Sequence, residues 1–243
     1  MSDHHYRTCT GVQLGMQLVT TGRPLRRRLN LATVTAVLVL MPMACAYKGI
    51  TLPAVTAMTL HGDGTLTQPT PESTSRANTG TLAYTYNPAL APPGARLSVL
   101  MSPQEESTNA ESTVSGLLPN RGYAVHAHVN ACSPNPAGEG PHYQNRVDPA
   151  VNPTSVSPEA STNPEYANPR NEIWLDVRTD ANGSGTSRTT VPFVFTDRGP
   201  GSIVVHEAME TATGPGQAGK AGARIACLSL SAVQPREHPR GSS

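Results

Sequence analysis

Four histidines are the residues of this sequence best suited to chemistry. His126, His128, His142 and His206 lie between residues 80 and 232, which contain no other histidine. His126 and His128 fall on one expected strand, whose period of two places both rings on the same face. Imidazole ligands suit copper and zinc, and a tetragonal set of nitrogens favours copper(II). A lone His-x-His pair is more often an ordinary surface or core feature, so the prediction of a metal site rests on all four.

Short segments with alternating hydrophobicity must position these histidines. Most are bounded by Gly, Pro or Asn, and none has sustained helical periodicity. Residues 180–183 read Asp-Ala-Asn-Gly, a hairpin signal, because Asn-Gly accepts the positive φ of such a turn. The pattern predicts an all-β fold, an antiparallel sandwich or barrel. The expected strands are Thr81–Tyr86, Arg96–Met101, Ser112–Leu117, Tyr123–Val129, Ile173–Thr179, Thr186–Phe195, Ser202–His206 and Ala223–Leu230.

The first 45 residues have the layout of a secretory signal. Residues 26–28 are all arginine and precede an apolar stretch, Leu29–Ala44, which is short for a membrane span of about 20 residues. Small residues follow, where a peptidase can cut; alternatively, Cys45 is lipidated and anchors the chain to a membrane. Met16 is an alternative start, and a buried helix is the alternative interpretation of the apolar stretch. The prediction is an extracytoplasmic protein, whether secreted, periplasmic or membrane-anchored.

Composition sets the rest of the layout. The chain has 18 Lys+Arg and 17 Asp+Glu, so no net positive field exists to recruit nucleic acid. Its 23 Pro and 21 Gly favour short strands, turns and linkers. We expect a flexible Thr/Pro/Ser-rich linker at 46–79 with a frayed strand at Ala54–Leu60, a β domain at 80–232 and a polar tail at 233–243. The loop at 134–171 is long enough to be functional or disordered.

The predicted export bears on whether the cysteines form a disulfide. Cys9 and Cys45 fall in the processed region, which leaves Cys132 and Cys227 in the mature domain. Two cysteines in an exported, β-rich chain predict one disulfide. Closing a loop of that length stabilises a domain by about 4–5 kcal/mol in the chain-entropy model. Two buried free thiols are the alternative.

Four blocks around these residues resemble one family. They are Gly122–His128 (GYAVHAH), Gly140–Tyr143 (GPHY), Val204–Glu207 (VVHE) and Gly219–Cys227 (GKAGARIAC). In order and spacing they resemble the signature blocks of the copper/zinc superoxide dismutases, and the resemblance covers residues 80–232. The last block is the most specific, because its Gly-x-Ala-Gly-x-Arg-x-Ala-Cys run rarely arises otherwise.

The resemblance implies a role for each residue. His126, His128 and His206 would bind copper, and His142 would be the histidine that bridges copper and zinc in zinc-bearing members. Arg224 would guide the superoxide anion to copper; its alternative is an ion-paired surface arginine. Cys132 and Cys227 would form the family's disulfide, and the fold would be the eight-stranded Greek-key β-barrel.

The chain also departs from the family in its zinc ligands. Zinc-bearing members carry two more histidines and an aspartate after the bridging histidine, whereas no histidine lies between Tyr143 and Val205 here. Asp148, Glu172 and Asp176 remain, but carboxylates beside one imidazole are poor zinc ligands. We therefore expect copper without zinc. Either Glu172 or Asp148 is expected to hold the second nitrogen of His142.

One further departure concerns the segment after His206. In the family, an aspartate there links the two metal sites, and Glu210 is its nearest counterpart. Residues 207–222 carry only Glu207, Glu210 and Lys220 as charges, which weakens electrostatic steering by this segment.

These observations predict an exported copper superoxide dismutase acting on the superoxide anion. One alternative is a copper-binding module that stores or transfers the metal without fast turnover. The other is a β-sandwich without metal that serves as an adhesion or structural module. Oligomeric state is not predicted.

Overall fold

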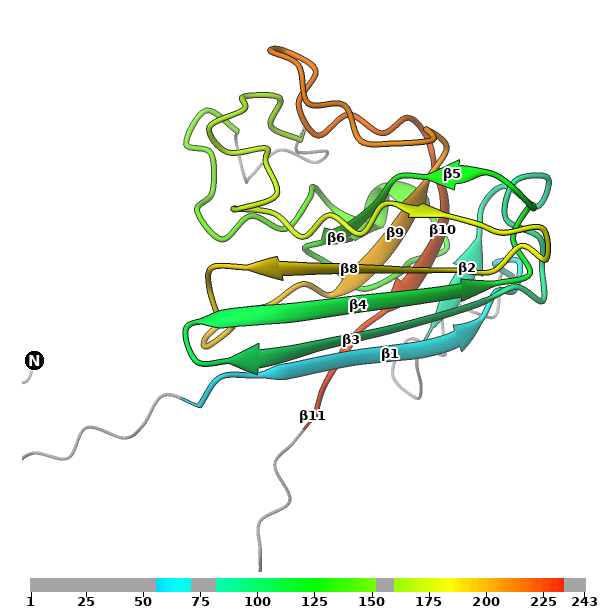
Figure 1. Ribbon diagram of the computed structural model, residues 1–243, viewed down its shortest axis with the longest axis horizontal. Coiled ribbons are helices and arrows are strands. Elements are labelled where there is room, and N and C mark those ends of the chain that lie inside the picture. Colours follow the sequence, from blue (N-terminus) through cyan, green and yellow to red (C-terminus); the bar gives the residue numbers. More distant parts are fainter. Residues whose placement is uncertain (1–55, 71–81, 152–159, 234–243) are drawn as a thin grey trace, which may run out of the picture. The chain divides into compact units, whose positions relative to one another are not determined.

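Two antiparallel sheets form the fold in a computed structural model, which describes residues 56–70, 82–151 and 160–233 (Figure 1). The first sheet has the strand order β11-β1-β3-β4-β8 and the second β2-β10-β9-β6. The first contains β1 Thr59–Thr65, β3 Arg96–Gln104, β4 Ser107–Ser115, β8 Gly185–Val191 and β11 Ser231–Val233. The second contains β2 Ala83–Thr85, β6 Val125–His128, β9 Ser202–His206 and β10 Arg224–Ser229. A separate pair joins β5 Gly122–Tyr123 to β7 Val177–Arg178, and Pro136–Glu139 form a 3₁₀ helix.

The hydrophobic core lies between the two sheets. On β3, Leu97, Val99 and Met101 alternate with more exposed residues, so one face of this strand is buried. From the second sheet, Ile203 and Val205 of β9 enter the same core. The all-β antiparallel sandwich predicted from the sequence is therefore confirmed. No helix in the described ranges is long and apolar enough to cross a membrane.

The second sheet is covered on its other face as well. All five residues of β9 are buried, and Val204 packs with Tyr84 and the half-cystines Cys132 and Cys227 in a smaller cluster. One member of this cluster, Cys132, belongs to the loop that follows β6. The loop carrying His142 is thereby packed against the sheet that carries the other three histidines.

Strand β1 is the main difference from the sequence expectation. It lies inside the range predicted as a linker and pairs with β3 over six residues, from Leu60 to Thr65. Its two glycines explain why the pattern looked like a linker. A Cβ on Gly62 would lie 2.6 Å from the Ser229 carbonyl oxygen, and one on Gly64 would lie 2.7 Å from the Ala83 Cβ. The strand approaches the second sheet too closely for larger residues.

Other strands also begin or end at different residues from those expected. β4 begins at Ser107 rather than Ser112, because its first half buries small side chains such as Ala110 that give little hydrophobic signal. The expected strand Ile173–Thr179 contributes only β7 and one isolated bridge, from Trp174 to His126. The predicted signal segment, lipidated Cys45, alternative start Met16 and most of the polar tail lie outside the described residues.

Removing β1 should cost most of the fold's stability. A chain that begins at residue 80 loses the buried Leu60 and Leu66 and exposes the edge of β3. Loss of two buried leucines costs about 2–5 kcal/mol each, against a typical total of about 5–15 kcal/mol. We expect cooperative thermal unfolding for a chain that begins at residue 56 and none for one that begins at 80. Equal melting temperatures would contradict the assignment of β1 to the sandwich.

Candidate metal centre

The fold brings the four predicted histidines together from three places in the chain. His126 and His128 lie on β6, which pairs with β9, and His206 is the last residue of β9. His142 reaches them through an isolated antiparallel bridge between its backbone and that of His128. One ring nitrogen from each histidine lies within 4.8 Å of all the others, and all four residues are buried. Such a group can hold a metal ion.

Three of the rings present the Nε2 atom to the centre. The Nδ1 atom of His128 lies 2.9 Å from the Gly140 carbonyl oxygen, and that of His206 lies 3.3 Å from the Gly222 carbonyl oxygen. The Nδ1 atom of His142 lies 2.9 Å from Glu172 Oε2. Carbonyl and carboxylate oxygens only accept hydrogen bonds, so each Nδ1 carries the proton. The lone pair of each ring is then on Nε2, the atom available to a metal, and the Nε2 atoms of His128 and His206 lie 3.2 Å apart.

His126 faces the centre with its other nitrogen. Its Nε2 lies 2.6 Å from Thr211 Oγ1, and the Thr211 hydroxyl donates its only hydrogen to Asp176 Oδ1 at 2.7 Å. Nε2 must therefore carry the proton and donate to Thr211, which leaves the lone pair on Nδ1. That Nδ1 atom is buried without a hydrogen-bond partner. An unpaired buried acceptor is costly, and a metal ion at the centre would satisfy it.

Burial keeps these rings neutral. Loss of solvation lowers the pKa of His126 and His128 well below the usual value, and the neighbouring His142 adds to the shift. The same effect of burial lowers the pKa of His206 to about 3. Three imidazoles that stay unprotonated at neutral pH keep their lone pairs available for a metal.

Glu172 is the partner of His142. Its carboxylate is buried and accepts hydrogen bonds from Trp174 Nε1 and Gln144 Nε2, both at 2.7 Å, in addition to His142 Nδ1. Asp148, the other candidate, instead accepts from the Ser161 hydroxyl at 2.5 Å. The structure therefore distinguishes two carboxylates that the sequence left equivalent.

Asp176 and Thr211 are site residues that sequence reasoning missed. Asp176 accepts from the Thr211 N–H at 2.7 Å and from the Val125 N–H at 3.1 Å, so it ties the segment after β9 to β6. Glu210, the expected counterpart of the family's linking aspartate, is exposed. No spacing signal in the sequence joins Asp176 to a residue 35 positions away.

Removing the Thr211 hydroxyl should weaken metal binding. Thr211→Val keeps the side-chain shape but leaves His126 Nε2–H without an acceptor, so the ring loses its fixed orientation. Removing a residue that hydrogen-bonds to a metal ligand lowers metal affinity by about 10–100-fold. For the neutral Thr211 hydroxyl we expect a loss of about tenfold. Competition with a copper chelator measures the change. Thr190→Val, which removes an exposed hydroxyl bonded to Asn109 on the first sheet, is the control. Wild-type affinity in Thr211→Val would contradict the role.

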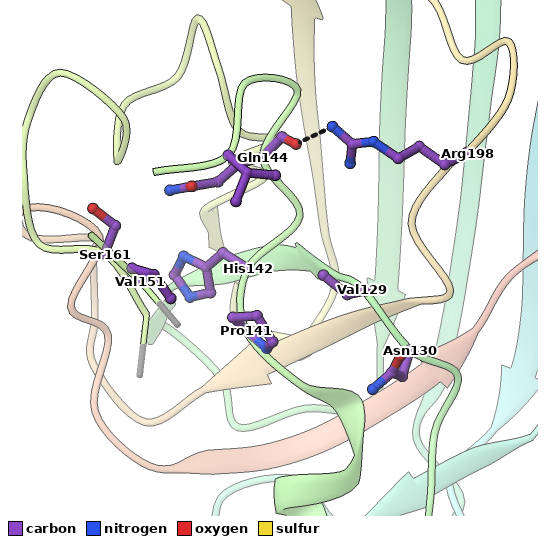
Figure 2. A pocket seen from close by; sticks show the side chains of 9 residues that line it. Val129, Asn130, Pro141, His142, Gln144, Val151, Ser161 and Arg198 are labelled. Atoms are coloured by element: carbon purple, nitrogen blue, oxygen red, sulfur yellow. Dashed lines mark hydrogen bonds between the residues drawn. The ribbon is translucent and has the colours of Figure 1, made fainter. Parts of the chain in front are cut away.

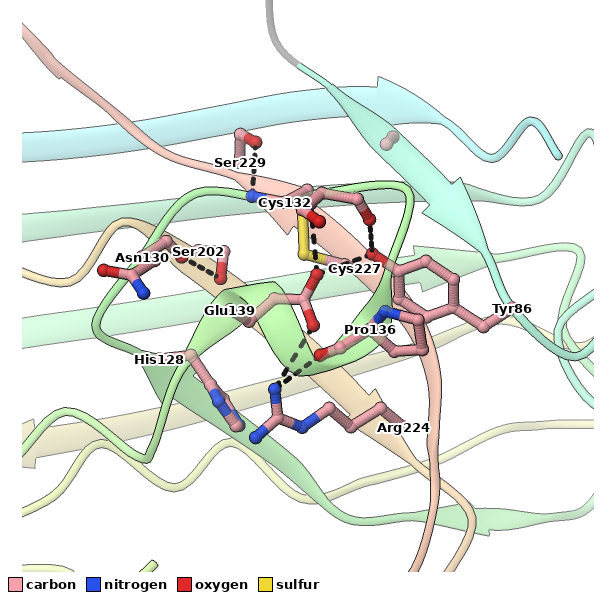
Figure 3. Close-up of a disulfide and its surroundings, with 12 residues drawn as sticks. Tyr86, His128, Asn130, Cys132, Pro136, Glu139, Ser202, Arg224, Cys227 and Ser229 are labelled. Carbon is pink, nitrogen blue, oxygen red and sulfur yellow. Dashed lines mark hydrogen bonds and ion pairs between the residues drawn. A yellow bond between two sulfur atoms is a disulfide. The ribbon is translucent and has the colours of Figure 1, made fainter. Parts of the chain in front are cut away.

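Arg224 begins β10 and lies near His128, in the surroundings of the disulfide (Figure 3). Its guanidinium donates to the Gly140 carbonyl at 2.6 Å, the same oxygen that His128 Nδ1 contacts, and to the Pro136 carbonyl at 2.5 Å. Arg224 is also the cross-strand neighbour of His206. Cys132 and Cys227 form the predicted disulfide, which joins β10 to the loop that Arg224 contacts.

A cavity of about 310 Å³ opens on the flank of His142 (Figure 2). Its wall includes the apolar side chains of Val129, Pro141 and Val151 and the polar side chains of Gln144 and Arg198. The Arg198 guanidinium donates to the Gln144 carbonyl oxygen at 2.8 Å. His142 lines this cavity and is otherwise buried.

Fold and site together define a disulfide-containing β-sandwich with a buried four-histidine cluster able to bind a metal. No protein-family model matches the chain, and no curated protein sequence matches it.

Proposed function

We propose that this protein is an exported copper-dependent superoxide dismutase. The observation that carries the proposal is the set of four imidazole lone pairs, three on Nε2 and one on Nδ1, directed at one buried point. An all-nitrogen set of this kind favours copper. Copper would supply one-electron chemistry, oxidising one superoxide to dioxygen and reducing a second, with two protons, to hydrogen peroxide.

Glu172 would determine which nitrogen of His142 carries a proton at the site. Glu172 keeps the proton of His142 on Nδ1, so that Nε2 is the atom that binds metal or takes up a proton for the product. Trp174 and Gln144 hold the carboxylate in place for this. Because Glu172 lies where a second metal would meet His142 Nδ1, we propose a copper site without zinc.

Replacing Glu172 by Gln should disturb both stability and the metal site. The carboxylate accepts from three N–H donors, whereas an amide presents one oxygen and an NH2 group, so at least one buried donor loses its acceptor. That costs about 1–3 kcal/mol. We also expect copper affinity to fall by about 10–100-fold. Asp148→Asn is the matched control, since it alters a buried carboxylate of the same loop that does not contact His142. Equal copper affinity in both variants would refute the role.

Arg224 would attract the substrate. The guanidinium stays charged at working pH, and about a quarter of its side chain, 23%, is exposed. Its position beside His206 and His128 places a fixed cation next to the metal ligands. The superoxide anion would therefore be drawn to the centre from this side.

Export is supported by the disulfide, because such bonds form and persist mainly in oxidising compartments. The signal segment at 1–45 is part of the proposal, with removal of Cys45 or its lipidation as the two alternatives.

Superoxide decay by the copper-loaded, disulfide-oxidised full chain tests the proposal. We expect a rate constant within about a decade of the diffusional ceiling of about 10⁸–10⁹ M⁻¹ s⁻¹, which superoxide dismutases are known to approach. The metal-free chain is the control. A loaded chain no faster than copper bound at an ordinary surface site would refute the proposal.

A copper-binding module without fast turnover is the second candidate. One observation favours it: the buried carboxylate of Glu139 lies 3.3 Å from the Arg224 guanidinium and offsets part of its charge. Tight copper binding combined with negligible superoxide decay would select this function.

A further inference from the structure

Glu139 is a buried carboxylate that the copper chemistry does not use. It ends the 3₁₀ helix Pro136–Glu139, and none of its side chain is exposed. Oε1 lies 3.1 Å from the Ser133 nitrogen and 2.6 Å from the Tyr86 hydroxyl. Oε2 faces the Arg224 guanidinium at 3.3 Å (Figure 3). Within the described ranges, Arg224 is the cation that contacts this carboxylate.

The position of Arg224 does not depend on Glu139 alone. Two backbone carbonyls, those of Pro136 and Gly140, accept from its guanidinium at 2.5 and 2.6 Å. Both belong to the loop that the Cys132–Cys227 disulfide fixes to β10. These contacts hold the guanidinium in place even without the carboxylate's charge.

The charge of Glu139 must therefore act mainly on the field around Arg224. A carboxylate in a buried position is poorly screened by solvent, so it cancels more of a neighbouring positive charge than an exposed one does. The guanidinium is the charged group beside His128 and His206, where an anion would approach. Glu139 lowers the attraction that such an anion feels.

We propose that Glu139 acts through Arg224, by offsetting its charge, to limit the affinity of the metal centre for anions. The proposal rests on copper binding by the four histidines, and it identifies a determinant of anion selection that lies outside the ligand set. Tyr86 and Ser133 hold the carboxylate against Arg224 and so maintain this limit.

Azide, an anion that binds copper(II), is the probe. We would titrate it optically into the copper(II)-loaded full chain and its Glu139→Gln variant. Removal of one partly screened charge should tighten azide binding about threefold or more. Glu111→Gln is the matched control, because Glu111 pairs with Arg188 in the same way but on the exposed face of the first sheet. Its azide affinity should equal that of wild type.

A second pair of variants keeps the test valid if Glu139→Gln folds poorly. Arg224→Met combined with Glu139→Gln removes the buried pair together, which is better tolerated than removing one member. In the Arg224→Met background the change at Glu139 should alter azide affinity less than twofold, because the cation through which Glu139 acts is absent.

The outcomes separate this inference from the proposed function. Chains that fail to bind copper would refute the metal site itself. Copper-loaded chains in which Glu139→Gln leaves azide affinity unchanged, or weakens it, would overturn the role of Glu139 while leaving the metal site intact. Tighter azide binding that persists at full size in the Arg224→Met background would also overturn it.

Discussion

His206→Ala should abolish catalysed superoxide decay. The side chain supplies one of four converging nitrogens, and its Nδ1 is fixed by the Gly222 carbonyl so that Nε2 faces the centre. Removing a residue that hydrogen-bonds to a metal ligand lowers metal affinity by roughly 10–100-fold. Removing the ligand itself should lower the affinity by more than this. We therefore expect copper affinity to fall more than 100-fold and the decay rate to return to that of the metal-free chain.

The control for this variant is His61→Ala. His61 is an exposed histidine on β1, and its replacement should leave copper retention and decay rate unchanged. Unfolding curves of the metal-free chains would show that His206→Ala still folds. Activity that survives in a folded His206→Ala chain would contradict the assignment of His206 to the site.

Replacing Cys132 and Cys227 together by serine should destabilise the fold strongly. The bond closes a loop across a sequence separation of 95 residues. In the chain-entropy model such a loop contributes about 4–5 kcal/mol, a large share of the roughly 5–15 kcal/mol that stabilises a typical domain. Urea unfolding of the metal-free chain should show a midpoint shift corresponding to this loss.

The same double substitution should also loosen the site. The loop tied down by Cys132 carries the Gly140 carbonyl that orients His128 and holds Arg224. Cys9→Ser and Cys45→Ser are introduced into both the disulfide-bonded chain and the doubly substituted chain to prevent thiol exchange. The two chains then differ only in the Cys132–Cys227 bond. A loss below about 1 kcal/mol would show that packing of Val204 and Tyr84 alone secures this loop, contrary to our account.

Hydrophobicity patterns were sufficient to predict the strands whose own residues carry an apolar alternation or an apolar run. Leu97, Val99 and Met101 alternate visibly on β3, and the buried run of β9 ends at His206. β1 was predicted only as a frayed strand at Ala54–Leu60, because two of its inward positions are glycines. The role of Gly62 depends on a close approach to Ser229, more than 160 residues away, and that of Gly64 on one to Ala83. Hydrophobic periodicity cannot report a close approach of two backbones.

The four clustered histidines were predictable, but most of the residues that orient their rings were not, and Glu172 was only one of two candidates for His142. The His-x-His spacing and the residue blocks around His142 and His206 pointed to the four histidines that the fold brings together. The pairing of His126 with Thr211 spans 85 residues, and that of His142 with Glu172 spans 30. Each depends on which loop lies over which strand, so it becomes visible only in the folded chain.

The claim on which this account depends is that four imidazoles bind one copper ion. Copper(II) titration of the full chain, followed by electron paramagnetic resonance, tests it most directly, because nitrogen hyperfine structure reports the donor atoms. We predict one tightly bound ion per chain with a four-nitrogen signature, lost in His206→Ala. A spectrum dominated by oxygen donors, or one unaffected by His206→Ala, would contradict the account.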